Sequence, residues 1–197
     1  MNSKILSVFV IFLLGLTSFA LAAPIDGQNG AVAQQTQEKM QIRIQDGTHF
    51  GEGGQMMQFK TQANNQMRLE VGGIGANSDL ELKQQMVGDA TKLSVGLSNG
   101  KNAEIKVMPD KASETALEKL KLKTCSEENE CSIELKEVGS GDKIKAAYEV
   151  KTQRQAKVLG LFKAQMQVQA QVDAETGEVL RVKKNWWAFL ASEPAEE

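Results

Sequence analysis

The stretch AQMQVQAQVDAETGEVLRV, residues 164–182, decides the fold. Its first part alternates apolar residues with glutamine, which is typical of a strand with one buried face and one wet face. The apolar positions are Ala164, Met166, Val168, Ala170 and Val172, and the glutamines are Gln165, Gln167, Gln169 and Gln171. DAETG then predicts a turn, because Asp173 can accept hydrogen bonds from the turn backbone and Gly177 can adopt a left-handed conformation. The stretch therefore predicts a β-hairpin whose acidic residues serve the turn.

The return strand of this hairpin is predicted to point Leu180 and Val182 inward and Arg181 and Lys183 outward. The glutamine face of the first strand carries few charges, and strands of this kind are prone to pair at a sheet edge. This face is therefore either a surface for self-association or a neutral wet face.

Alternating runs of the same kind precede the hairpin, with segments rich in Gly, Asn and Asp between them. Their inward residues are predicted to be Met40, Ile42 and Ile44; Met67, Leu69 and Val71; Leu80 and Leu82; Leu93, Val95 and Leu97; Ala103, Ile105 and Val107; Ile133 and Leu135; and Ile144, Ala146, Tyr148 and Val150. The residues that alternate with the last set, among them Ala147 and Glu149, are predicted to be wet. Connections this short favour antiparallel pairing, because parallel strands need long crossovers.

One segment, MPDKASETALEKLKLKT at residues 108–124, has helical spacing instead. Pro109 and Asp110 suit a first turn, and the following apolar residues fall on one helix face. These apolar residues are Ala112, Ala116, Leu117 and Leu120. We therefore predict a mainly β fold of the α+β class, an antiparallel β-meander with one short helix packed on the sheet.

The N-terminus has the three-part pattern of an export signal. Lys4 precedes an apolar run from Ile5 to Ala20, and Ala20 and Ala22 are spaced as in a cleavage site. We predict cleavage after Ala22 and a secreted or cell-envelope protein. The alternative is an uncleaved anchor, since the run approaches the roughly 20 residues that span a bilayer.

Five segments follow from these patterns. They are a signal peptide (1–22), a flexible linker (23–38), an antiparallel β region (39–108), a helix plus antiparallel sheet (109–185), and an aromatic then acidic tail (186–197). The whole chain has 23 Lys and Arg against 25 Asp and Glu, so removal of Lys4 leaves 22 against 25 and a net charge of −3. No basic stripe is present in the sequence, which argues against a nucleic-acid partner.

The two cysteines, Cys125 and Cys131, are predicted to form a disulfide, as a close pair does in an exported protein. These thiols and the single, distant His49 do not supply the four ligands of a structural zinc site. His49 is also the only histidine that a catalytic triad could use, and it lies in a Gly-rich turn. Met40, Met67, Met86 and Met166 occupy apolar positions of the alternation, where they fill a core, and only Met56 and Met57 stand out as candidate copper ligands. We therefore predict no metal, no cofactor and no enzymatic activity.

AAYEV at residues 146–150, followed by VDAETGEVLRV at residues 172–182, resembles the C-terminal hairpin of the PepSY family. The resemblance implies a small exported domain with a helix on an antiparallel sheet, a binding or inhibitory role in the cell envelope, and no catalytic residues. The chain differs from that family in its disulfide loop and in a long connection at residues 151–163. Residues 105–138 and 160–191 also resemble a group of uncharacterised exported archaeal proteins, which implies an origin and no activity.

Trp186, Trp187 and Phe189 form a possible interaction surface near the C-terminus. Beside Lys183 and Lys184 they suit peripheral contact with a membrane. We favour a tail that folds back on the sheet and buries one Trp, because the acidic residues that follow would be repelled by anionic lipid. The sequence thus predicts an exported, non-catalytic binding or structural module of the cell envelope, whose partner is an envelope protein or a second copy. The alternative is a PepSY-like regulator or inhibitor of an envelope peptidase.

Overall fold

The computed structural model describes residues 42–125 and 130–192. The predicted signal peptide (1–22), the linker (23–38) and the acidic end of the tail (193–197) lie outside the described residues. The strands are β1 (Ile42–Arg43), β2 (Gly47–Phe50), β3 (Met56–Thr61), β4 (Met67–Val71), β5 (Ile74–Ser78), β6 (Leu82–Val87), β7 (Ala90–Gly96), β8 (Asn102–Ile105), β9 (Ser132–Val138), β10 (Lys145–Val158), β11 (Phe162–Asp173), β12 (Val179–Lys184) and β13 (Ala191–Ser192). The helical elements are the α-helix α1 (Pro109–Leu120) and the 3-10 helices η2 (Gly141–Lys143) and η3 (Trp186–Leu190).

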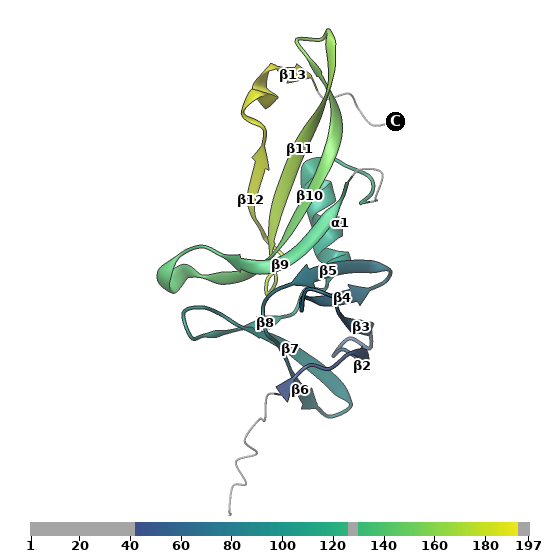
Figure 1. The fold of residues 1–197 in the computed structure, drawn as a ribbon, viewed down its shortest axis with the longest axis vertical. Helices are drawn as coiled ribbons and strands as arrows, with labels where there is room; N and C mark the ends of the chain where they lie inside the picture. The colour runs from purple at the N-terminus through teal and green to yellow at the C-terminus, as the bar shows by residue number, and fades with distance from the viewer. Residues whose placement is uncertain (1–41, 126–129, 193–197) are drawn as a thin grey trace, which may run out of the picture. The chain divides into compact units, whose positions relative to one another are not determined.

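The strands form two sheets (Figure 1). The smaller sheet has the order β1-β6-β7-β8, and the larger runs β12-β11-β10-β9-β5-β4-β3-β2, with β13 paired to β10. The prediction of a mainly β fold with antiparallel pairing and one α-helix is confirmed for the residues that the structure describes. The larger sheet contains strands from both sides of the boundary predicted between residues 108 and 109, which itself lies at the start of α1.

One strand pair departs from the predicted meander. β5 and β9 run parallel, with Asn77 opposite Glu134 and Ser78 opposite Leu135. A parallel pair needs a long crossover connection, and here β6, β7, β8 and α1 form that connection. The buried Ser78 hydroxyl reinforces the junction by donating to the Leu135 carbonyl at 2.8 Å.

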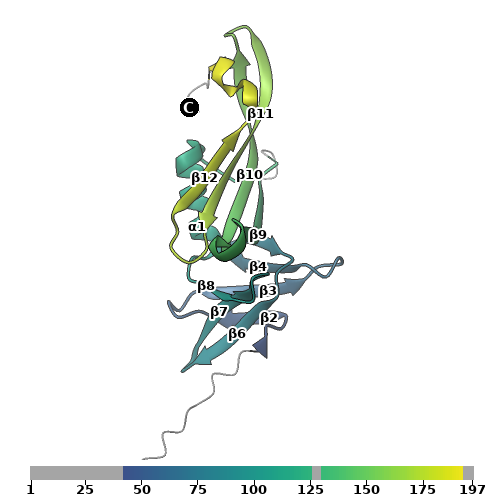
Figure 2. The ribbon, with the colours of Figure 1, turned by 90° about the vertical axis from the view of Figure 1, so that its left-hand side faces the viewer.

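The predicted alternation of buried and wet residues is confirmed in β4, β7 and the second half of β11. The apolar core residues of these strands are Met67, Leu69 and Val71; Leu93 and Val95, with Leu97 directly after β7; and Met166, Val168, Ala170 and Val172. Helix α1 contacts β4, β5, β10, β11 and β12, and Figure 2 shows it beside the strands of the larger sheet. Its buried residues are Pro109, Ala112, Ser113, Ala116 and Leu120, most of them small, which allows a close approach of helix and sheet.

The predicted wet face of β10 is wrong at Ala147 and Glu149. Both residues are buried, as is Tyr148 between them, so this part of β10 is covered on both faces. β10 lies between β9 and β11, and long polar side chains from both neighbours, described below, close over Glu149.

The inward orientation predicted for Leu180 and Val182 is also wrong, because they are 39% and 36% exposed. β12 is the edge strand of the larger sheet. A register shift makes Leu180 an extra residue between two pairs of the ladder, which is a β-bulge. An edge strand with a bulge lacks the second neighbour that would cover these side chains.

Candidate functional site

The hairpin of β10 and β11 occupies the segment predicted as a connection at residues 151–163. Its strands stay paired as far as Val158 and Phe162. Three residues, Leu159, Gly160 and Leu161, connect the strands, and the Leu161 N–H donates a hydrogen bond of 3.1 Å to the Val158 carbonyl. Leu159 and Gly160, the two central residues of this β-turn, have positive φ values of 54° and 71°. Positive φ at both positions matches the twist of the flanking strands and so lets the hairpin continue to its end.

The C-terminal segment docks on the end of this hairpin. β13 pairs with the last residues of β10, and the Leu159 N–H donates a hydrogen bond of 2.9 Å to the Leu190 carbonyl. These bonds hold η3 beside the hairpin turn, as Figure 1 shows at the end of the molecule that carries β13. Two segments far apart in the sequence therefore meet at one place.

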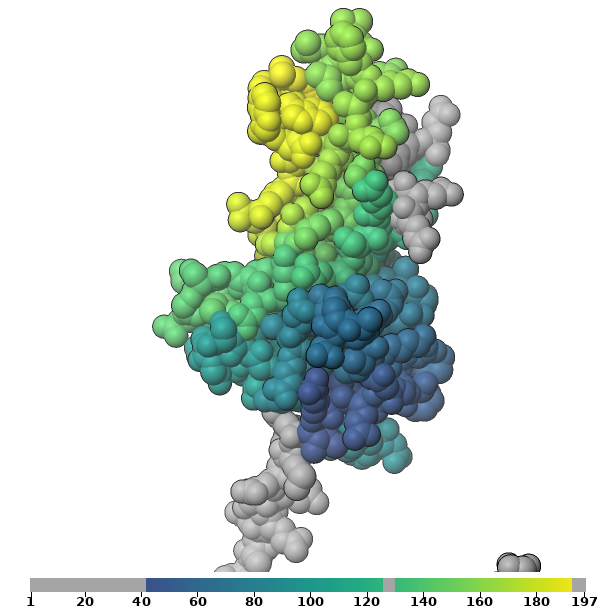
Figure 3. All heavy atoms as spheres, viewed as in Figure 1, coloured from purple at the N-terminus to yellow at the C-terminus, as the bar shows by residue number. Residues whose placement is uncertain are grey.

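Five large apolar side chains are exposed where these segments meet, and together they form the tip surface. They are Leu159 (64% exposed), Leu161 (78%), Phe162 (67%), Trp186 (81%) and Phe189 (76%). In Figure 3 the hairpin end protrudes at the top, with the yellow C-terminal residues against it. Large apolar side chains that gather in exposed positions mark a site of interaction with a protein or a membrane.

The two tryptophans differ in their surroundings. Trp187 and Ala188 are partly buried and pack against the core, whereas Trp186 and Phe189 project outward. The segment forms the 3-10 helix η3 rather than an extended strand. Two of the three aromatic residues predicted as an interaction surface thus belong to the tip surface, and Trp187 anchors the segment.

Sequence reasoning missed Leu159, Leu161 and Phe162. The available signal was an apolar run around a glycine, flanked by Lys157 and Lys163. Residues of this kind in a turn need an explanation other than core packing.

The two segments that carry the tip surface contain charges of one sign only. Segments 151–172 and 179–192 contain seven basic residues and no Asp or Glu, although the whole chain has a net charge of −2. Lys157, Lys163 and Lys183 among them are exposed. The tip surface is therefore apolar with a positive surround.

A polar cluster occupies the face of the larger sheet opposite Tyr148. The Glu149 carboxylate is nearly inaccessible and accepts hydrogen bonds from Lys151 (2.9 Å), Gln171 (2.8 Å), Lys136 and Gln169. Burial by itself raises the pKa of the Glu149 carboxyl, but the hydrogen bonds from Lys136, Lys151 and Gln171 outweigh it and lower the pKa to about 2. Glu149 is therefore a structural group that is ionised near neutral pH and joins three strands.

In the turn between β11 and β12, the Asp173 carboxylate accepts hydrogen bonds from the turn backbone, as predicted. Asp173 Oδ1 accepts hydrogen bonds from the N–H groups of Glu175 (2.9 Å) and Thr176 (3.2 Å), and Oδ2 accepts one from Lys145 Nζ (2.7 Å). Burial raises the pKa of the Asp173 carboxyl, while the Lys145 ammonium and the two N–H groups together lower it below its ordinary value. Gly177 has a φ of 78°, the left-handed conformation that the turn requires.

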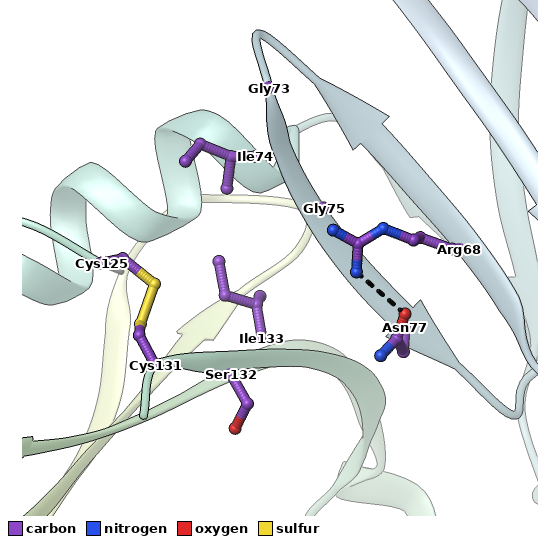
Figure 4. A pocket seen from close by; sticks show the side chains of 9 residues that line it. All are labelled: Arg68, Gly73, Ile74, Gly75, Asn77, Cys125, Cys131, Ser132 and Ile133. Carbon is purple, nitrogen blue, oxygen red and sulfur yellow. Dashed lines mark hydrogen bonds between the residues drawn. A yellow bond between two sulfur atoms is a disulfide. The ribbon is translucent and has the colours of Figure 1, made fainter. Parts of the chain in front are cut away.

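A second candidate is a cleft of about 350 Å³ where β5 and β9 diverge (Figure 4). Arg68 and Asn77 line one side and are joined by a hydrogen bond of 3.3 Å from Arg68 Nη1 to Asn77 Oδ1. The other side is formed by the predicted disulfide between Cys125 and Cys131, which is present with its Cα atoms 5.2 Å apart. Gly75 lies under the Arg68 guanidinium, where an added Cβ would collide with it. The cleft combines the Arg68 cation with the apolar side chains of Ile74 and Ile133, which suits binding.

The side chain of the single histidine has structural partners. His49 Nε2 lies 3.2 Å from the Gln45 carbonyl oxygen, and its ring meets Phe59 edge-on at 5.3 Å. Among residues 42–125 and 130–192 no three His, Cys, Asp or Glu side chains gather as metal ligands would.

In the same residues no helix has the length and apolar character needed to cross a bilayer.

Comparison with known proteins finds no matching family model, no matching curated protein and no matching solved structure. The resemblances to PepSY domains and to exported archaeal proteins therefore stay predictions.

Proposed function

We propose that the protein is an exported, non-catalytic binding module of the cell envelope. The observation that carries this proposal is the tip surface, where five apolar side chains are more than half exposed, three on the β10–β11 hairpin and two on η3, which docks on the hairpin end. Exposing such side chains to water is unfavourable, so a surface of this kind is retained for a contact. The Cys125–Cys131 disulfide and the N-terminal sequence pattern support export.

The charged side chains support a non-catalytic role because they have structural tasks. Glu149 binds two lysines and two glutamines, and Asp173 organises a turn. Lowered pKa values keep both carboxylates ionised and therefore unable to act as general acids near neutral pH.

A crosslinking experiment tests the binding role. A photoreactive phenylalanine analogue replaces Phe162 of the tip surface in one chain and Phe50, which is 56% exposed on β2, in a matched control. In cells, we expect the analogue at position 162 to crosslink to an envelope component and the analogue at position 50 to give little product. Equal yields at the two positions would contradict the proposal.

The cleft favours a second candidate, a PepSY-like regulator or inhibitor of an envelope peptidase. Arg68 and the apolar walls could hold the end of a peptide chain. Gly75→Ala would displace the guanidinium, whereas Gly96→Ala adds a Cβ that meets only ordinary contacts. If the protein inhibits an envelope peptidase through this cleft, Gly75→Ala should weaken inhibition and Gly96→Ala should not.

A further inference from the structure

We propose that the tip surface inserts into the headgroup region of a lipid bilayer that contains anionic lipid. This inference rests on the proposed binding role and names what the tip surface binds.

The first argument is composition. The tip surface contains three exposed aromatic side chains, Phe162, Phe189 and Trp186. Aromatic residues of this kind are enriched at the boundary between lipid and water, where an apolar body meets a wet surface. The aliphatic residues Leu159 and Leu161 lie at the turn itself, where they would enter deepest.

The second argument is charge. Lys157 and Lys163 flank the turn on its two strands and are paired across the ladder. A lysine at a bilayer surface can lay its alkyl chain along the apolar layer and keep its ammonium among the headgroups. Basic residues beside an inserted surface are attracted by anionic lipid, and this attraction falls with salt.

The geometry of the tip surface favours a bilayer over a second copy of the chain as its binding partner. The hairpin end that carries Leu159, Leu161 and Phe162 protrudes (Figure 3), so it fits a deformable layer without a matching groove. Two copies that met tip to tip would bring Lys157 and Lys163 of each chain together. Their mutual repulsion disfavours self-association through this surface.

Acidic residues also contact or follow the segments that carry this surface. Glu130 is exposed and accepts a hydrogen bond from Gln153. Glu193, Glu196 and Glu197 follow η3 and β13 and lie outside the described residues. A chain that ends at Ser192 removes these three carboxylates and should bind anionic lipid more tightly than the parent.

The test measures co-sedimentation of the exported protein with vesicles of phosphatidylcholine, with and without phosphatidylglycerol. We expect the parent to bind the anionic vesicles, with a blue shift of tryptophan emission and quenching by lipids brominated near the headgroup. The double variant Leu161→Ser/Phe162→Ser should bind about 100-fold more weakly, because two apolar side chains no longer leave water. Lys157→Gln/Lys163→Gln should weaken binding about tenfold and reduce its dependence on salt.

The matched control is Phe50→Ser/Met56→Ser, which removes a comparable exposed pair from paired positions of β2 and β3. It should bind vesicles like the parent. All variants carry the same N-terminus, so differences between them report on the tip surface, and unchanged circular dichroism and unfolding midpoints show that each is folded.

Three results would overturn the inference. The first is a tip variant that binds anionic vesicles as tightly as the parent. The second is a parent that ignores both vesicle types while the analogue at position 162 crosslinks to an envelope protein, which would leave the proposed binding role intact. The third is a parent that sediments as a dimer and becomes monomeric on Leu161→Ser/Phe162→Ser, which would make the tip surface a self-association interface.

Discussion

Replacement of Glu149 by Gln should remove a large part of the pH dependence of folding stability. The Glu149 side chain is 4% exposed and is held by Lys136, Lys151, Gln169 and Gln171. Glutamine has the same shape but stays neutral at every pH. The variant therefore isolates the contribution of the carboxylate charge.

The magnitude follows from the pKa of Glu149, which falls from 4.5 to about 2 on folding. At about 1.4 kcal/mol for each unit, the ionised carboxylate stabilises the fold by up to about 3 kcal/mol. The pKa is lower in the folded state, so this stabilisation is fully present above the unfolded pKa of 4.5 and is lost as the pH falls toward 2. Lys136 and Lys151 are 33% and 36% exposed, so solvent and salt reduce the value toward about 2 kcal/mol.

The assay is urea unfolding of the parent and of Glu149→Gln, followed by circular dichroism between about pH 7 and about pH 2. The parent should be more stable than the variant near neutral pH, and the difference should shrink toward zero in acid. Glu81→Gln, at an exposed position, should follow the parent at every pH. A difference between parent and Glu149→Gln that stays constant over the whole range would refute the role assigned to the charge.

Three further changes test other parts of the fold by chemical denaturation. Replacing both Cys125 and Cys131 by Ser should lower the free energy of unfolding by about 2 kcal/mol, because the disulfide closes a short loop with a sequence separation of 6. A loss several times larger would mean that the disulfide stabilises more of the fold than the loop that it closes. Trp187→Ala should cost about 2 kcal/mol because Trp187 packs partly against the core, while Trp186→Ala should change stability by less than about 0.5 kcal/mol; the reverse order would contradict the docking of η3. Gly177→Ala should cost about 1 kcal/mol, because a φ of 78° is unfavourable for a residue with a Cβ, and an unchanged midpoint would argue against this turn.

The candidate site was predictable only in part. The cysteine pair and the aromatic residues Trp186 and Phe189 could be singled out from spacing and composition. Their relation to Leu159, Leu161 and Phe162 could not, because it depends on the pairing of β13 with β10. The cleft beside Arg68 also needed the tertiary structure, since it opens where two strands from distant parts of the chain diverge.

The sequence by itself determined the local structure. Alternation of apolar and polar residues identified the strands at β4, β7 and β11, since side chains on a strand point alternately to its two faces. The turn at Asp173 to Gly177 and the helix that begins at Pro109 follow equally from chemistry within a few residues.

Only the tertiary structure decided which strands are neighbours and which faces are covered. The parallel β5–β9 pair joins residues on opposite sides of α1, and nothing in the local pattern of either strand specifies the other. Glu149 is buried because β10 is a central strand, and Leu180 is exposed because β12 is an edge strand. Side chains of the neighbouring strands shield a central strand from water on both of its sides, and an edge strand has such a neighbour on one side only. Local periodicity sets the two faces of each strand, and the long-range packing of the whole chain sets which of them meets water.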